Sequence, residues 1–106
     1  MDDEAVPEVD VAALEQGAAE GGFVLDVRQP DEYEAGHVPG AVLIPLDQLA
    51  ARADEVPTDR PVYVVCRSGA RSAVAVQALR RAGYDATNVA GGTLAWADSG
   101  RAVNRP

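Results

Sequence analysis

The chain has 106 residues, so it has room for one small domain and for no second core. Apolar residues make up 47% of it and charged residues 25%, which is typical of a folded globular protein and not of a disordered one. The formal net charge of −8 argues against nucleic acid or an anionic membrane as a partner, since both need a basic surface. No apolar run reaches the roughly 20 residues of a membrane span, and the acidic residues 2–4 differ from the basic start of a signal peptide. We therefore expect a soluble, cytoplasmic monomer.

Charge is unevenly distributed along the chain, which contains no lysine. Residues 1–59 contain 2 arginines and 15 acidic residues, whereas residues 60–106 contain 7 arginines and 2 aspartates. A local basic site for a small anion is therefore expected in the second half. The single cysteine, Cys66, cannot form an internal disulfide, and with the single histidine, His37, it provides too few ligands for a zinc cluster. The sequence thus predicts no disulfide, no metal site and no cofactor.

The first half of the chain alternates short apolar runs with helical patterns, as parallel α/β proteins do. In chain order, the expected elements are a strand at residues 8–9, a helix capped by Asp10, a buried strand at residues 23–25, a short helix from Pro30, a turn at residues 36–40 and a strand at residues 41–44.

The second half is built around residues 62–65, four β-prone residues that give the strongest strand prediction. A helix at residues 46–53 and a loop at residues 54–61 are expected before it. After it we expect a helix closed by Gly83, a strand at residues 86–89, and a last helix that Thr93 caps and whose Leu94 and Trp96 lie in the core.

Cys66 directly follows the central strand, at a glycine-containing loop that opens a helix. Backbone N–H groups and the helix dipole point at an anion in such a place, and Arg67 and Arg71 add positive charge. These surroundings lower a cysteine pKa from about 8.5 to roughly 3.5–7.5, so Cys66 is predicted to be a thiolate nucleophile that needs no histidine base. The alternative is a small buried hydrophobic residue, which is what free cysteines often are.

The residues around Cys66 favour the nucleophile. Residues 66–72 read Cys-Arg-Ser-Gly-Ala-Arg-Ser, which resembles the active-site loop of the rhodanese-like sulfurtransferases, where the loop holds a cysteine persulfide. Three further stretches resemble other motifs of this family, in the same order: Leu25-Asp26-Val27-Arg28 with Glu32-Tyr33, Gly36-His37-Val38-Pro39-Gly40-Ala41, and Gly91-Gly92 with Trp96.

The resemblance covers residues 7–99 and implies a three-layer α/β/α fold around a five-stranded parallel sheet of strand order 1-5-4-2-3. Residues 1–6 and 100–106 would then be tails, the first of them flexible. It further implies that Cys66 takes a sulfur atom from a small anionic donor such as thiosulfate and passes it to a thiol or an acceptor protein. The anion would be held by the backbone of Arg67, Ser68, Gly69, Ala70, Arg71 and Ser72, with support from the two arginine side chains.

We expect four other polar residues to support the site or the fold around it. Asp26 and Arg28 follow a strand that the family places beside that of Cys66, where such sheets bind ligands. We expect Asp26 to hold Arg71 or the loop backbone, the alternative being a structural ion pair between Asp26 and Arg28. His37 is expected to anchor backbone, and Glu32 to brace a helix end or a loop.

Two other functions stay open. A phosphatase or arsenate reductase of the same fold would use a similar loop, although phosphatase loops have five residues between cysteine and arginine and this chain has four between Cys66 and Arg71. A non-catalytic rhodanese-like binding module is the second alternative, and the intact cysteine argues against it.

Overall fold

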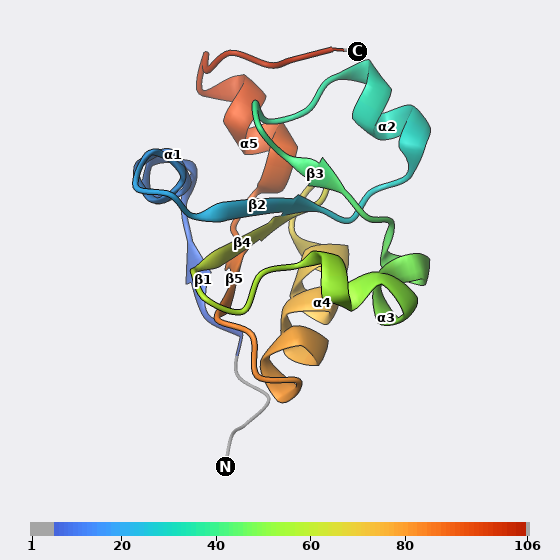
Figure 1. Ribbon diagram of the computed structural model, residues 1–106. Coiled ribbons are helices and arrows are strands. Elements are labelled where there is room, and N and C mark those ends of the chain that lie inside the picture. The colour runs from blue at the N-terminus through green and yellow to red at the C-terminus, as the bar shows by residue number, and fades with distance from the viewer. Residues whose placement is uncertain (1–5, 106) are drawn as a thin grey trace.

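Five parallel strands form one sheet in the order β1-β5-β4-β2-β3, which confirms the predicted order (Figure 1). The computed structural model describes residues 6–105. Of the predicted tail at residues 1–6, all but Val6 lies outside the described residues. The elements are β1 (Glu8–Val9), α1 (Val11–Ala19), β2 (Phe23–Asp26), α2 (Pro30–Ala35), β3 (Val42–Leu43), α3 (Leu49–Arg52), β4 (Val62–Val65), α4 (Ala70–Arg81), β5 (Ala86–Val89) and α5 (Gly92–Asp98).

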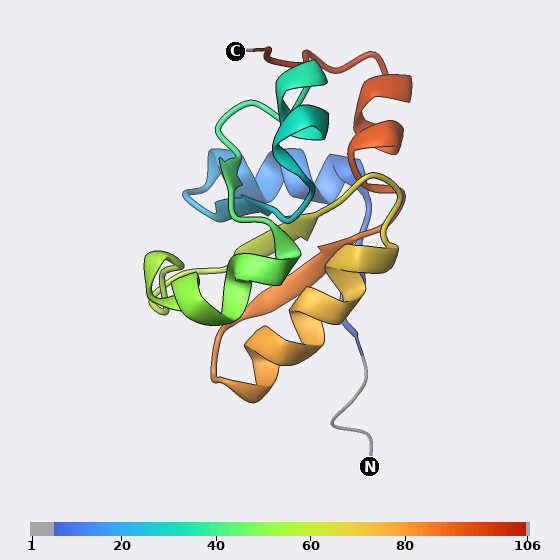
Figure 2. The same ribbon diagram turned by 90° about the vertical axis from the view of Figure 1, so that its right-hand side faces the viewer.

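Helices cover both faces of the sheet, so the chain has the three-layer α/β/α arrangement. Helices α1, α2 and α5 lie on one face, and α3 and α4 lie on the other (Figures 1 and 2). Side chains of β2 and β4 alternate between the two cores: Val24 packs with Trp96 on the first face, whereas Leu25 and Val64 pack with Leu79 on the second. The central strands are therefore buried on both sides, and polar groups gather where they end.

The segment between β3 and β4 is less regular than the sequence predicts. Ala41 belongs to a turn, since its N–H donates to Val38 O at 3.0 Å, and β3 has only two residues. The predicted helix at residues 46–53 is a 3₁₀ turn (Leu46–Gln48), the four-residue α3 and a second 3₁₀ turn (Ala53–Glu55). Ala53 O accepts a 3₁₀ hydrogen bond from Val56 N–H at 3.0 Å and a second hydrogen bond from the Tyr84 hydroxyl at 2.8 Å.

Thr93 does not cap α5, and Leu94 is not in the core, so both predictions are wrong. The cap position is Gly91, with a φ of 76°, and Thr93 is the second residue of α5. The N–H of Thr93 donates to Cys66 O at 2.9 Å. Leu94 is 41% exposed, whereas Trp96 is buried as predicted and its Nε1 donates to Ala102 O at 2.7 Å.

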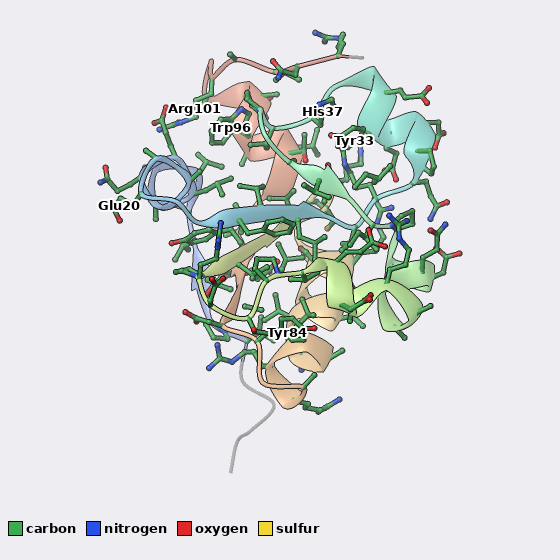
Figure 3. All side chains as sticks on the ribbon, in the orientation of Figure 1. Glu20, Tyr33, His37, Tyr84, Trp96 and Arg101 are labelled. Carbon is green, nitrogen blue, oxygen red and sulfur yellow. The ribbon has the colours of Figure 1, made fainter. Side chains whose placement is uncertain are left out.

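The C-terminal segment runs from α5 across to α2 (Figures 1 and 2). Asn104 exchanges two backbone hydrogen bonds of 2.9 Å with His37, and the Arg101 guanidinium lies 5.6 Å from the centre of the Trp96 ring (Figure 3). His37 itself stacks on Tyr33 and has its Nδ1 2.8 Å from Tyr33 O, which confirms its expected backbone-anchoring role. Part of the segment predicted as a C-terminal tail is thus hydrogen bonded to the domain.

Candidate active site

The loop between β4 and α4 surrounds the Cys66 sulfur. Gly69 N–H donates to Sγ at 3.1 Å, and Ser72 Oγ lies 3.3 Å from it. Cys66 is only 1% exposed, whereas Arg67, Ser68 and Ala70 are exposed, so the sulfur lies at the base of the loop. Gly69 adopts a φ of 114°, a conformation that favours glycine, and this turns the chain into α4.

These contacts favour a thiolate. Burial raises the pKa of the Cys66 thiol, but hydrogen bonds from the Ser72 hydroxyl and from the backbone N–H groups of Ser72, Gly69 and Ser68 lower it. The net result is a pKa below the usual value for cysteine. The hydrogen bonds of the loop contribute more to this shift than the arginine charges that the sequence pointed to.

Arg71 is held by Glu32 and not by Asp26. Its Nη1 and Nη2 donate to the two Glu32 carboxylate oxygens at 2.7 and 2.8 Å, so the pair is bidentate. The hydrogen bond from Arg71 holds the pKa of Glu32 down to about 2, against a smaller effect of burial that raises it. Glu32 also accepts from Gln29 N–H at 2.9 Å at the start of α2. Both expected roles of Glu32, at a helix end and at a loop, are confirmed.

Asp26 and Arg28 form the alternative that the sequence left open, a buried ion pair. Arg28 Nη2 lies 2.8 Å from Asp26 Oδ2 and also donates to Gly36 O at 2.9 Å. The predicted contact of Asp26 with Arg71 or with the backbone of the Cys66 loop is wrong. Arg28, two residues further along the same edge, occupies the carboxylate with its Nε, its Nη2 and its backbone N–H. The pair fixes the turn at Gly36 to the end of β2.

A buried polar network behind the sulfur was missed by the sequence reasoning. Ser72 Oγ lies 2.5 Å from Asn88 Oδ1, so its single hydrogen is shared between this oxygen and Cys66 Sγ. Asn88 Nδ2 donates to Glu8 Oε2 at 3.0 Å and to Gly69 O at 3.2 Å. Asn88 is 1% exposed, so this amide links β1 and β5 to the Cys66 loop. The signal available in the sequence was an asparagine in the middle of an apolar strand, which costs free energy unless it is hydrogen bonded.

The turn at Gly91-Gly92 places the start of α5 against the backbone of the Cys66 loop. Thr93 N–H donates to Cys66 O at 2.9 Å and Leu94 N–H donates to Arg67 O at 3.0 Å. A Cβ atom on Gly92 would lie 2.5 Å from Cys66 O, and Gly92 has a φ of 55°. Glycine is therefore required here both for the close approach and for the backbone conformation.

Within residues 6–105, no group of three or more histidine, cysteine or acidic side chains is placed to hold a metal ion. Over the same range, no helix is long and apolar enough to cross a bilayer.

The chain is similar to known proteins over most of its length. It is 39% identical over 104 residues to a sulfurtransferase of Allochromatium vinosum, a match that covers 95% of this chain and 97% of that one. The crystal structure of a rhodanese-related protein from Thermoplasma volcanium superposes with a TM-score of 0.89 at 30% identity, covering 94% of this chain and 99% of that chain. A thiosulfate sulfurtransferase from Pseudomonas aeruginosa superposes with a TM-score of 0.85 at 25% identity, covering 94% of this chain but 20% of that one.

Two Bacillus subtilis relatives are longer, and the matched region spans 59% and 51% of their lengths. The sequence profile of the rhodanese-like domain family matches residues 10–99. The chain therefore belongs to the rhodanese-like domain family.

Proposed function

We propose that the protein is a sulfurtransferase that carries a sulfane sulfur as a persulfide on Cys66. The observation that carries this proposal is the Cys66 sulfur itself. Cys66 directly follows the central strand, its sulfur accepts hydrogen bonds from its own loop, and its pKa is lowered. A thiolate in this place is a nucleophile at neutral pH, and the loop N–H groups that face Sγ also suit the negative charge of a persulfide.

Thiosulfate is the donor that we propose. The Cys66 thiolate attacks the outer sulfur of thiosulfate, a bond forms between Sγ and that sulfur, and the bond to sulfite breaks, with its electron pair leaving on sulfite. Support comes from the dianionic charge of this donor, which suits a loop of N–H donors, and from the similarity to a thiosulfate sulfurtransferase.

The second half of the reaction removes the sulfur. The chain has one cysteine, so the persulfide has no second thiol within this chain with which to form a disulfide. The outer sulfur then passes to an external nucleophile, which we propose to be a thiol of a small molecule or of a partner protein.

An assay with thiosulfate as donor and cyanide as acceptor tests the proposal. We expect thiocyanate to form with the natural protein and not with Cys66→Ser, whose hydroxyl fits the loop but does not accept sulfur. Hydrolysis of an aryl phosphate, lost in Cys66→Ser, would instead support the phosphatase alternative. Failure of both assays with a folded protein would support a non-catalytic binding module.

A further inference from the structure

A pocket of about 290 Å³ borders the Cys66 loop. It lies between the end of α2, the loop, α5 and the C-terminal segment, which come together at one end of the molecule (Figures 1 and 2). Thr93 places the pocket beside the Cys66 loop, because this residue lines the pocket and its N–H donates to the backbone oxygen of Cys66. Arg67, the residue after the cysteine, also lines it.

The pocket has an excess of positive charge. Two of its charged residues are neutralised, since Arg28 is paired with Asp26 and Glu32 with Arg71. The other two, Arg67 and Arg105, form no hydrogen bond or ion pair with any side chain among residues 6–105. The Arg105 guanidinium lies against Gly36, with Nη2 3.8 Å from the position that a Cβ on this glycine would occupy. Two unpaired guanidinium groups in one pocket indicate an anionic ligand.

An unsatisfied hydroxyl lies in the same wall. Thr93 is 8% exposed, and among the described residues its Oγ1 is the buried side-chain atom that has no hydrogen-bond partner. Such a group costs free energy in the folded protein unless another molecule provides the partner. Since Thr93 lines the pocket, a polar atom of the ligand is the partner that fits.

The remaining wall is apolar. Leu94, which is 41% exposed, lies here with Ala97 and Val103. Thiosulfate has no apolar part to use such a surface, whereas a thiol on a short carbon chain does. The ligand indicated by these three features has an anionic group, a polar atom and an aliphatic portion.

We propose that this pocket binds the acceptor of the second half-reaction, and that this acceptor is a small aliphatic thiol that carries a carboxylate. The assignment rests on the proposed persulfide on Cys66. Arg67 and Arg105 bind the carboxylate, Leu94 contacts the carbon chain, and the thiolate approaches the outer sulfur. A bond forms between the acceptor sulfur and the outer sulfur, the bond to Sγ breaks, and its electron pair returns to Cys66 as a thiolate.

The test uses protein that has been loaded with thiosulfate and freed of the donor, so that only the second half-reaction is followed. Persulfide is discharged in a single turnover by 3-mercaptopropionate, 2-mercaptoethanol or cysteamine, which are short thiols with a negative, neutral and positive end group. Each rate is divided by the concentration of the ionised thiol, which removes differences that come only from the pKa of the three thiols. We expect 3-mercaptopropionate to be the fastest by about tenfold or more, the size of one charge-assisted hydrogen bond.

Two variants locate the effect. Arg105→Gln should lower the preference for 3-mercaptopropionate over 2-mercaptoethanol by about tenfold, whereas Arg60→Gln, the same change at an exposed arginine paired with Asp59, should leave this preference unchanged. Thr93→Val should also slow discharge by 3-mercaptopropionate without lowering the midpoint of urea unfolding, because it removes an unsatisfied hydroxyl.

The possible failures are distinguishable. A protein that does not load persulfide contradicts the proposed function, and the pocket assignment with it. A protein that loads, but that discharges the three thiols at equal rates per thiolate, contradicts the pocket assignment alone. Equal effects of Arg105→Gln and Arg60→Gln on the preference for 3-mercaptopropionate would do the same.

Discussion

Arg71, in the first turn of α4, donates two hydrogen bonds of 2.7 and 2.8 Å to the carboxylate of Glu32 in α2, and this pair joins the Cys66 loop to the opposite side of the site. The guanidinium is occupied by the carboxylate and does not contact the sulfur directly. The pair links the first turn of α4 to α2, while the loop's own N–H groups and Ser72 face Cys66.

The first prediction concerns Glu32→Gln, which removes the charge but keeps an oxygen for Gln29 N–H. We expect a loss of about 1 kcal/mol at pH 7, because both side chains are partly exposed and solvent screens the pair. A carboxylate with a lowered pKa stabilises the fold above its unfolded pKa, and this is lost as pH falls through the folded value. The difference between the two proteins should therefore shrink from about pH 4.5 down to about pH 2. Urea unfolding at several pH values measures it, and a difference that does not change with pH would contradict the ion-pair account.

Ser72→Ala should raise the pKa of Cys66, because it removes the largest of the hydrogen bonds that lower it. The rate of alkylation by iodoacetamide as a function of pH gives this pKa. Ser68→Ala is the matched control: Ser68 acts on Cys66 through its backbone N–H, which alanine keeps, so the pKa should not move. Equal pKa values in all three proteins would show that the Ser72 hydroxyl does not stabilise the thiolate.

Asn88→Ala should destabilise the fold by about 2–3 kcal/mol. It removes three hydrogen bonds and leaves the buried Ser72 hydroxyl without its amide partner. Asn104→Ala, at an exposed asparagine whose hydrogen bonds to His37 come from its backbone, should change stability by less than about 0.5 kcal/mol. Similar unfolding midpoints for the two variants would mean that the network contributes little.

Gly92→Ala should destabilise the protein more than Gly100→Ala and should also slow persulfide formation. Both glycines have a positive φ, 55° and 84°, so both substitutions introduce backbone strain. Only at Gly92 does the new Cβ meet backbone, 2.5 Å from Cys66 O, whereas nothing lies within 4 Å at Gly100. Thermal unfolding and a thiosulfate assay of both variants measure the difference. Persulfide formation slowed equally in both would mean that the contact at Gly92 does not position the loop.

The sequence predicted most of the sheet because its strands have strong local signals. Residues 62–65 are β-prone and buried on both faces, and Cys66 follows them directly. The family resemblance then provided the strand order and the loop.

The contacts that complete the site depend on tertiary structure, and local patterns do not contain them. Glu32 and Arg71 are 39 residues apart, and Asn88 and Glu8 are 80 residues apart. The error at Asp26 has a local cause, because Arg28 lies only two residues away and its guanidinium occupies the Asp26 carboxylate. Thr93 was misplaced because a threonine near a helix start resembles a cap, whereas its N–H is used to hold Cys66.

The most direct test of the central claim is the intact mass of the protein after incubation with thiosulfate and removal of the excess. The persulfide account predicts a gain of one sulfur atom in the natural protein, reversed by cyanide or by a thiol, and no gain in a folded Cys66→Ser variant. An unchanged mass in the natural protein, or an equal gain in Cys66→Ser, would contradict it.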